Sequence, residues 1–283
     1  MFPWLIGMGR LRQAHKRFFD VVVPDSARPG KVRRVYKGYH GRIAELQDRH
    51  KGELGFIVAN GPSLRNIDLD VFADKVTIGS NGVYSFGGPD GFPTYFTMED
   101  WAQVYDRRKD FASIRSEKKI FALYNAAHVR ADNRTLFANV EPDSHGSSGR
   151  RFSDIYPQFS RDFASVVYQG ATITYINLQL AFFLGMDPVV IVGLDHNYGS
   201  IVDRFPPGKI TVTHDVMAAL SEVHAIPDYH SLGGTFGVPH VKLQEAAYLE
   251  ARRVFDSYGR TVLNATPGTH LDVFEKVRLE EIL

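Results

Sequence analysis

Polar turns follow several apolar segments of this chain, and their residues are of kinds that bind a charged ligand. The first reads Asn60-Gly61-Pro62-Ser63, between an apolar run and a helical pattern. Backbone amides at a helix N-terminus favour an anion, glycine allows close approach, and proline suits the first helical position. The turn matches neither the three-glycine dinucleotide fingerprint nor the Gly-Lys-Ser/Thr of a P-loop. We therefore predict an anion-binding corner of another class, and an ordinary strand–turn–helix corner is the alternative.

Three further strand ends carry comparable turns. Asn81 could offer both a donor and an acceptor, or form a simple Asn-Gly turn. The turn after the apolar run 189–192 contains Asp195, His196, Asn197 and Tyr198, and the last predicted strand closes with the polar segment 264–269. His196 could act as a general base or as a hydrogen-bonded support. The segment Gln169-Gly170-Ala171-Thr172 precedes an apolar helix and offers a second amide-rich N-terminus.

We find no pattern of metal ligands or of a nucleophilic triad. The four histidines between residues 200 and 240 do not have the His-Glu-x-x-His spacing of zinc enzymes. Asp68 and Asp70 resemble an Asp-x-Asp motif, but they lie within or after a helix, so we interpret them as solvated or capping residues. The nucleophile elbow Gly-x-Ser-x-Gly is absent. We predict no metal and no cofactor.

The elements that must position these turns are those of an α/β protein. From Gly55 onward, short apolar runs alternate with helical patterns, which indicates a Rossmann-like, mostly parallel sheet flanked by helices. The carboxyl ends of parallel strands share one edge, where open α/β sheets bind ligands, so the turns are expected to form a nucleotide-sized cleft. The expected strands are 56–59, 76–79, 94–98, 119–123, 189–192 and 261–263, and the clearest helices are 171–184 and 241–258.

Two units are predicted: a basic, helical N-terminal extension (1–51) and a Rossmann-like domain (52–283). Pro24, Pro29 and Gly30 divide the extension, whose second helix is expected at 35–50. Two stretches, 132–160 and 200–239, have the composition of irregular loops. Because the second follows a strand end, we expect a lid-like insertion there, with disorder as the alternative.

Composition excludes several classes of protein. A net charge of +1 argues against dedicated nucleic-acid binding, and the absence of cysteine excludes disulfides and fits a reducing cytoplasm. Residues 1–20 begin with aromatic and apolar side chains and then turn basic, the reverse of a signal peptide. This segment could contact the inner face of a membrane as a peripheral anchor, although we favour packing on the domain. The oligomeric state stays open, homo-oligomers included.

Six motifs, in order, resemble those of the bacterial MptE-like domain-of-unknown-function family, over residues 55–283. They are Asn60-Gly61-Pro62-Ser63-Leu64, Ile78-Gly79-Ser80-Asn81, Pro93-Thr94-Tyr95, Tyr168-Gln169-Gly170-Ala171-Thr172-Ile173-Thr174-Tyr175, Gly193-Leu194-Asp195-His196-Asn197 and Asn264-Ala265-Thr266-Pro267-Gly268. The family is named after an archaeal 6-hydroxymethyl-7,8-dihydropterin diphosphokinase. Its Asn-Gly-Pro-Ser-Leu turn and fold are similar to those of family 42 sialyltransferases and motility-associated flagellin glycosyltransferases, which use CMP-linked nine-carbon acid sugars without a metal.

The sialyltransferase resemblance implies a role for each turn. Asn60 would hold the ribose or phosphate of CMP, and Asn81 would touch the nucleotide or sugar. Thr172 would contact the donor, and Asn197 or Tyr198 its phosphate. The resemblance extends the donor site to the neighbouring residues Gly61, Pro62, Ser63, Gln169, Gly170 and His196.

The catalytic base of those sialyltransferases is a histidine shortly before the long C-terminal helix. The corresponding register in this chain falls on Phe236 or Gly237, with His230 and His240 on either side. The candidate catalytic residues are therefore His240 and His230, together with the strand-end carboxylate Asp195.

Three functions remain open at this level. The favoured one is a metal-independent glycosyltransferase that moves an acidic sugar from a CMP-linked donor to a glycan or lipid-linked acceptor in surface-polysaccharide synthesis. The second is diphosphate transfer from ATP to a pterin alcohol, which would need Mg²⁺ held by Asp195 with help from Glu99 and Asp100. The third is a non-catalytic nucleotide-binding protein.

Overall fold

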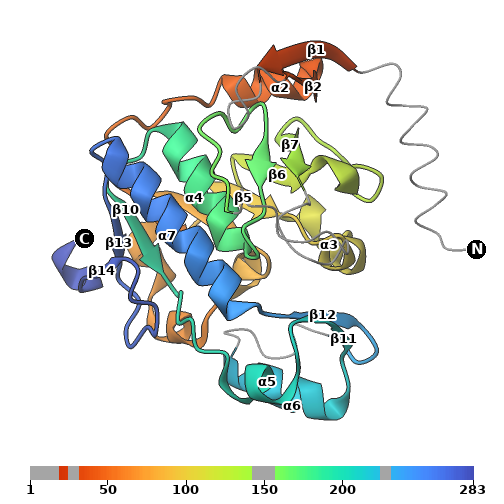
Figure 1. Cartoon of the computed structure of the whole chain (residues 1–283), viewed down its shortest axis with the longest axis vertical. Coiled ribbons are helices and arrows are strands. Elements are labelled where there is room, and N and C mark those ends of the chain that lie inside the picture. The colour runs from red at the N-terminus through yellow and green to blue at the C-terminus, as the bar shows by residue number, and fades with distance from the viewer. Residues whose placement is uncertain (1–18, 25–31, 142–156, 224–230) are drawn as a thin grey trace, which may run out of the picture.

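The computed structural model describes residues 19–24, 32–141, 157–223 and 231–283. Its centre is an eight-stranded sheet with the order β14-β13-β10-β3-β4-β5-β6-β7, in which every neighbouring pair is parallel (Figure 1). The predicted Rossmann-like α/β class is confirmed. The strands are β3 (Gly55–Val58), β4 (Val76–Ser80), β5 (Tyr95–Met98), β6 (Lys118–Ala122), β7 (Thr135–Ala138), β10 (Val189–Val192), β13 (Val262–Asn264) and β14 (Glu275–Lys276).

All six predicted strands are present, and the sheet has two more at its edges. β7 lies inside the stretch 132–160 that we expected to be an irregular loop, so that prediction is wrong for residues 135–138. A further pair of short parallel strands, β8 (Val140–Glu141) and β9 (Val167–Tyr168), brackets residues 142–156, which are outside the described part of the chain.

Alternate side chains of each strand pack into two separate apolar layers. Ile57, Ile78 and Tyr95 face the helices α4 (Ile173–Leu184) and α7 (Val241–Ser257), which lie side by side across one face of the sheet (Figure 1). Phe56 and Phe96 face the opposite layer. That layer comprises α3 (Trp101–Arg107) and the short 3₁₀ helices η1 (Pro62–Asn66), η2 (Leu69–Phe72), η3 (Val83–Phe86), η4 (Asp110–Ala112) and η5 (Leu123–Asn125). A last 3₁₀ helix, η8 (Leu279–Glu281), is close to the C-terminus.

The N-terminal extension differs from the helical prediction. Its described part is an antiparallel hairpin of β1 (Phe19–Pro24) and β2 (Val32–Tyr36), followed by the short helix α2 (Lys37–Ala44). The valine run at residues 21–23 explains the difference, because β-branched side chains favour extended backbone over helix. The membrane contact was predicted for residues 1–20, of which 1–18 are outside the described residues.

The stretch 200–239 is not an irregular loop. It contains the helices α5 (Gly199–Arg204) and α6 (His214–Val223), and the hairpin of β11 (Gly208–Thr211) and β12 (Thr235–Val238). These elements have a small apolar core of their own, centred on Ile201, Leu220 and Phe236. The insertion connects β10 to α7 and projects beyond the sheet (Figure 1). None of the helices in the described ranges is long and apolar enough to cross a lipid bilayer.

Candidate functional site

Unpartnered polar atoms lie where β3 and β4 end. Asn60, two residues after β3, donates from Nδ2 to the carbonyl oxygen of Ser80, the last residue of β4, over 3.0 Å. The other amide atom of Asn60, Oδ1, is buried without a hydrogen-bond partner, and so is Ser80 Oγ. A buried polar atom without a partner is costly, so each of these two atoms requires a partner, which is either a water molecule or a polar ligand.

Further buried polar atoms without a hydrogen-bond partner lie along this edge, toward β5. Asn81 has a left-handed backbone (φ 54°), and its amide donates to the carbonyl of Thr97 over 3.4 Å. The Thr97 hydroxyl donates to Asn177 Oδ1 over 2.5 Å, which leaves Asn177 Nδ2 buried and unpartnered. Of the six such atoms among the described residues, five belong to this edge: Asn60 Oδ1, Ser80 Oγ, Asn125 Oδ1, Asn177 Nδ2 and His196 Nδ1.

The Asn-Gly-Pro-Ser corner holds an anion, but the anion is the protein's own Asp195. Ser63 donates from its backbone amide to Asp195 Oδ1 over 3.1 Å and from its hydroxyl to Oδ2 over 2.7 Å. A Cβ at Gly61 would lie 1.9 Å from Oδ2 and 2.6 Å from the carbonyl oxygen of Gly193. Ser63 and Asp195 thus form a clasp between η1 and the end of β10, and the donor-binding roles of Gly61 and Ser63 stay predictions. Pro62 begins η1, as predicted.

The N-terminus of α4 is linked to the same edge through Gln169, whose side chain donates to Glu99. Gly170 and Ala171 both have positive φ (58° and 60°), and Thr172 caps the helix by accepting from the Thr174 amide over 3.3 Å. A Cβ on Gly170 would lie 2.1 Å from the Tyr175 ring, so only glycine fits there. This helix has twelve residues, and in its first turn the amides of Thr174 and Tyr175 both donate to Thr172.

His196 is buried at the end of β10 in a left-handed conformation (φ 52°). Its Nε2 lies 3.4 Å from Glu245 Oε1 on α7, while Nδ1 is buried without a partner. Burial lowers the pKa of His196, against the opposing effect of Glu245, so the ring is neutral at pH 7. Asn197 is exposed and accepts from the Gly199 amide over 3.0 Å.

The first turns of α7 tie the β10 turn to the N-terminus of α4. Tyr198 donates to Gln244 Oε1 over 2.6 Å, and Gln244 donates to the carbonyl of Ala171 over 3.2 Å. Tyr248 donates to the Thr172 hydroxyl over 3.4 Å, and burial raises the pKa of Tyr248 to about 12. Sequence reasoning missed Gln244, Glu245 and Tyr248. Their spacing on one helical face was the available signal.

Of the two histidines predicted as bases, His240 is described and His230 falls outside the described residues. His240 is the N-cap residue of α7, one turn before Gln244, and it is partly buried. The structure therefore places His240 beside the residues that hold the β10 turn. Its catalytic role, like that of Asp195, stays a prediction.

A carboxyl network that the sequence did not predict as a proton-transfer site surrounds Glu99, the residue directly after β5. Glu99 Oε1 accepts from the Tyr124 hydroxyl and from Gln169 Nε2, and these two donors lie 3.2 Å apart. Asn125 Nδ2 donates to the Glu99 carbonyl over 2.6 Å. Burial raises the pKa of Glu99 to about 7, although both side-chain hydrogen bonds lower it. A carboxylate immediately after a predicted strand was the sequence signal for this site.

The fourth polar turn supports the backbone of the third. Thr266 Oγ1 accepts from the Leu194 amide over 3.0 Å, and Thr269 Oγ1 donates to the Leu194 carbonyl over 2.8 Å. An open hollow of about 350 Å³ borders this turn. Asp68 caps η2 by accepting from the Asp70 amide, which confirms the capping interpretation.

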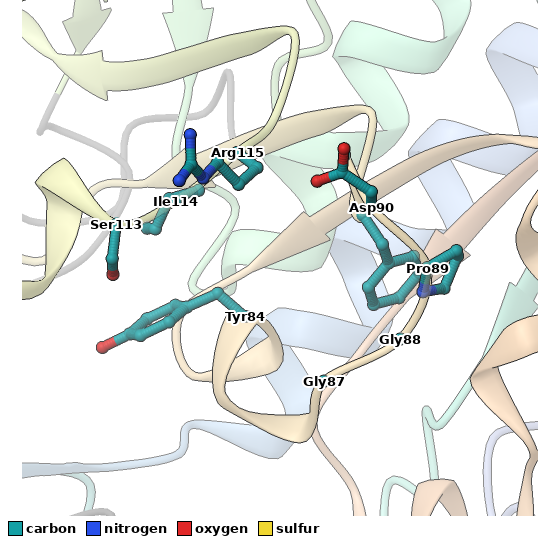
Figure 2. Close-up of a pocket in the computed structure, with 10 residues that line it drawn as sticks. Tyr84, Gly87, Gly88, Pro89, Asp90, Ser113, Ile114 and Arg115 are labelled. Atoms are coloured by element: carbon teal, nitrogen blue, oxygen red, sulfur yellow. The ribbon is translucent and has the colours of Figure 1, made fainter.

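A second hollow has a volume of about 200 Å³. It is formed by the loops that lead into β5 and β6, at the amino ends of these strands (Figure 2). Its lining residues are Tyr84, Gly87, Gly88, Pro89, Asp90, Gly91, Phe92, Ser113, Ile114 and Arg115. Within the described ranges, no cluster of three or more histidine and acidic side chains has a geometry that could hold a metal.

No protein-family model matches the chain, and no curated protein matches it. One solved structure is similar to it: the sialyltransferase CstII from Campylobacter jejuni, in complex with a substrate analogue, cytidine-5'-monophosphate. The two chains are 15% identical, the match covers 80% of this chain and 85% of that one, and the TM-score is 0.42. The resemblance to the MptE-like family stays a prediction.

Proposed function

We propose that this protein is a glycosyltransferase that moves an acidic sugar from a CMP-linked donor to a hydroxyl of a glycan or lipid-linked acceptor. The observation that carries the proposal is the row of unpartnered buried atoms Asn60 Oδ1, Ser80 Oγ and Asn177 Nδ2 at the carboxyl edge of the sheet. Uncharged acceptors and donors of this kind suit the base and ribose of a nucleotide. The order of the six sequence motifs supports the same donor class.

The N-terminus of α4 is our candidate for the phosphate of the donor. The Tyr175 ring packs against Gly170 where a Cβ would be, and the N-terminus of the twelve-residue helix supplies partial positive charge. Negative charge grows on this phosphate as the sugar leaves, so fixed amide dipoles stabilise the transition state more than the ground state. Tyr198 and Tyr248 hold the surrounding turns in place through Gln244 and Thr172.

The transfer also needs a proton acceptor. The acceptor hydroxyl attacks the anomeric carbon, the bond from that carbon to the phosphate oxygen breaks, and CMP leaves with the electron pair. A base near the attacking oxygen takes the hydroxyl proton. His240, at the start of α7, stays a candidate for this role.

Diphosphate transfer from ATP is less compatible with the site. That reaction would use Asp195 as a magnesium ligand. Both oxygens of Asp195 already accept from Ser63, so only their remaining lone pairs could serve a metal.

The test is the rise in melting temperature caused by CMP, CDP, UDP, GDP and ATP, each with and without Mg²⁺. A ligand at about 100 times its Kd stabilises the native state by about 2.7 kcal/mol. We expect CMP to act without Mg²⁺, and Asn60→Ala to abolish its effect. Asn139→Ala is the matched control, because Asn139 also donates from Nδ2 to a backbone carbonyl (Ser165, 3.1 Å) but lies after the edge strand β7.

The other outcomes separate the alternatives. A response to ATP that requires Mg²⁺ would replace the proposal with diphosphate transfer. The absence of a response to any of the five nucleotides would refute nucleotide-sugar transfer. A CMP effect that survives in Asn60→Ala would keep the donor class and move its binding site elsewhere.

A further inference from the structure

Donor binding does not account for the way Glu99 is held. Its carboxyl group receives two hydrogen bonds, from Tyr124 and Gln169, and both end on Oε1. Both donors are uncharged, so neither compensates a full negative charge. Oε2 receives neither of these hydrogen bonds, and it is the oxygen available to bind or release a proton.

The charged groups around Glu99 come from two elements. Asp100, the next residue, raises the pKa of Glu99, and Lys209 on β11 lowers it. Lys209 Nζ lies 3.8 Å from Asp100 Oδ2 and 4.8 Å from the centre of the Trp101 ring, so its charge is shared with Asp100. Tyr124, on η5, is the third titratable group that faces Glu99. With burial added, the carboxyl group is poised between its two protonation states near neutral pH.

Glu99 also lies next to the place assigned to the donor. Its partner Gln169 is three residues before Thr172, the N-cap of α4. Thr97, two residues before Glu99, pairs with Ser80 in the sheet. The carboxyl group is therefore connected to both the α4 N-terminus and the row of unpartnered atoms.

We propose that Glu99 is the catalytic base of the transfer, and that it takes the proton of the attacking hydroxyl on Oε2. This inference rests on the proposed function. The O–H bond breaks, and its electron pair forms the new bond to the anomeric carbon. The bond from that carbon to the phosphate oxygen breaks, and its pair leaves with CMP. The proton stays on Glu99 until it passes to water, so atoms and charge balance.

Tyr124 and Gln169 act in this scheme as positioning residues. Their hydrogen bonds to Oε1 fix the plane of the carboxyl group and direct Oε2 away from them. Both hydrogen bonds also lower the pKa of Glu99. Removing the Tyr124 hydroxyl should therefore shift the activity profile to higher pH, which a purely structural residue would not do.

The experiment measures CMP release from CMP-N-acetylneuraminate between pH 5 and pH 9, with water or lactose as the acceptor. We expect Glu99→Gln to lower kcat at pH 7.5 by about 100-fold or more while the CMP-induced rise in melting temperature stays. Tyr124→Phe should move the midpoint of the rising limb of kcat to higher pH. Glu117→Gln is the matched control, because Glu117 lies at the amino end of β6 in an exposed ion pair with Arg49.

Three results would overturn the inference. Glu99→Gln could keep more than a tenth of the wild-type rate, or His240→Asn could cause the large loss while Glu99→Gln does not. Wild-type protein could also bind CMP and release none from the donor, since a base of this strength beside the donor would activate water. A wild-type protein that does not respond to CMP would instead refute the proposed function itself.

Discussion

Two carboxylates follow strands of the same sheet edge, yet their surroundings differ. Asp195, after β10, accepts from Ser63 through both oxygens, one bond coming from a backbone amide. Glu99, after β5, accepts from Tyr124 and Gln169 through Oε1 within the described part of the chain, and burial raises its pKa to about 7. A carboxylate satisfied at both oxygens holds two segments together. A carboxylate that is held through one oxygen by uncharged donors can exchange a proton at the other oxygen. A place after a strand at this edge of the sheet therefore does not by itself distinguish a structural carboxylate from a base.

The largest change in stability is expected from a substitution at Gly61, which would break the clasp between η1 and Asp195. In Gly61→Ala the new Cβ would overlap Asp195 Oδ2 and the backbone oxygen of Gly193, and the second of these cannot move cheaply. We expect the free energy of unfolding to fall by about 3–4 kcal/mol, measured by chemical denaturation. Gly41→Ala in α2 is the control: nothing lies within 4 Å of its Cβ, and alanine should stabilise the helix by up to about 1 kcal/mol. Equal stability of Gly61→Ala and wild type would mean that the clasp does not form.

Removing the charge of the clasp should cost less. Asp195→Asn keeps the shape but replaces one acceptor oxygen with a donor that faces Ser63. The free energy of unfolding should fall by about 2 kcal/mol at pH 7.5. Asp256→Asn is the surface counterpart, because Asp256 forms an exposed 3.6 Å ion pair with Arg252, and it should change stability by about 0.5 kcal/mol or less. If both variants lose the same amount, the Asp195–Ser63 contact is no stronger than a surface ion pair.

The protonation of Glu99 should make the free energy of unfolding depend on pH. Folding raises the pKa of Glu99 from 4.5 to about 7, so the folded state binds the proton more tightly than the unfolded chain. The stability contributed by this group is complete below pH 4.5 and is lost as pH rises through 7. Glu99→Gln should lack this decrease and equal or exceed the wild type at pH 8. Parallel stability curves from pH 5 to pH 8 would show that Glu99 is ionised throughout.

Strand positions were predictable where the chain alternates apolar segments with helical patterns, and less so elsewhere. β14 has two residues, Glu275 and Lys276, and carries no apolar signal. β7 is flanked by polar residues, which made its four residues resemble a loop. The N-terminal hairpin was mistaken for a helix because prolines and basic residues outweighed the valine run. In each case a weak local pattern is overridden by pairing with a neighbouring strand.

The candidate site was predictable as a set of turns but not as a set of partners. Polar residues after apolar runs identified Asn60, Asn81 and the segments 169–172 and 195–198. Contacts across long stretches of chain were not visible: Ser63 and Asp195 are 132 residues apart, and Glu99 and Gln169 are 70 apart. Such contacts depend on strand order and on helix placement over the sheet, which the local pattern does not specify. The roles predicted for these residues therefore stay predictions, and the contrast between Asp195 and Glu99 became visible only in the fold.

The smallest change in stability is expected from a substitution at Lys209, which lies on β11 of the insertion. Lys209, 45% exposed, reaches Asp100 and the Trp101 ring from β11, and its charge lowers the pKa of Glu99. Lys209→Met should change the free energy of unfolding by less than about 1 kcal/mol, because exposed ion pairs and cation–π contacts contribute little. It should nevertheless move the midpoint of the Glu99-dependent stability change to higher pH, measured in the same denaturation series. Lys209→Arg should keep the wild-type midpoint.

The Asp195 clasp lies on other strands, so Asp195→Asn should lower the free energy of unfolding by the same amount in the wild type and in Lys209→Met. A midpoint that moves to lower pH in Lys209→Met would mean that Lys209 raises the pKa of Glu99 by covering it, instead of lowering it through its charge.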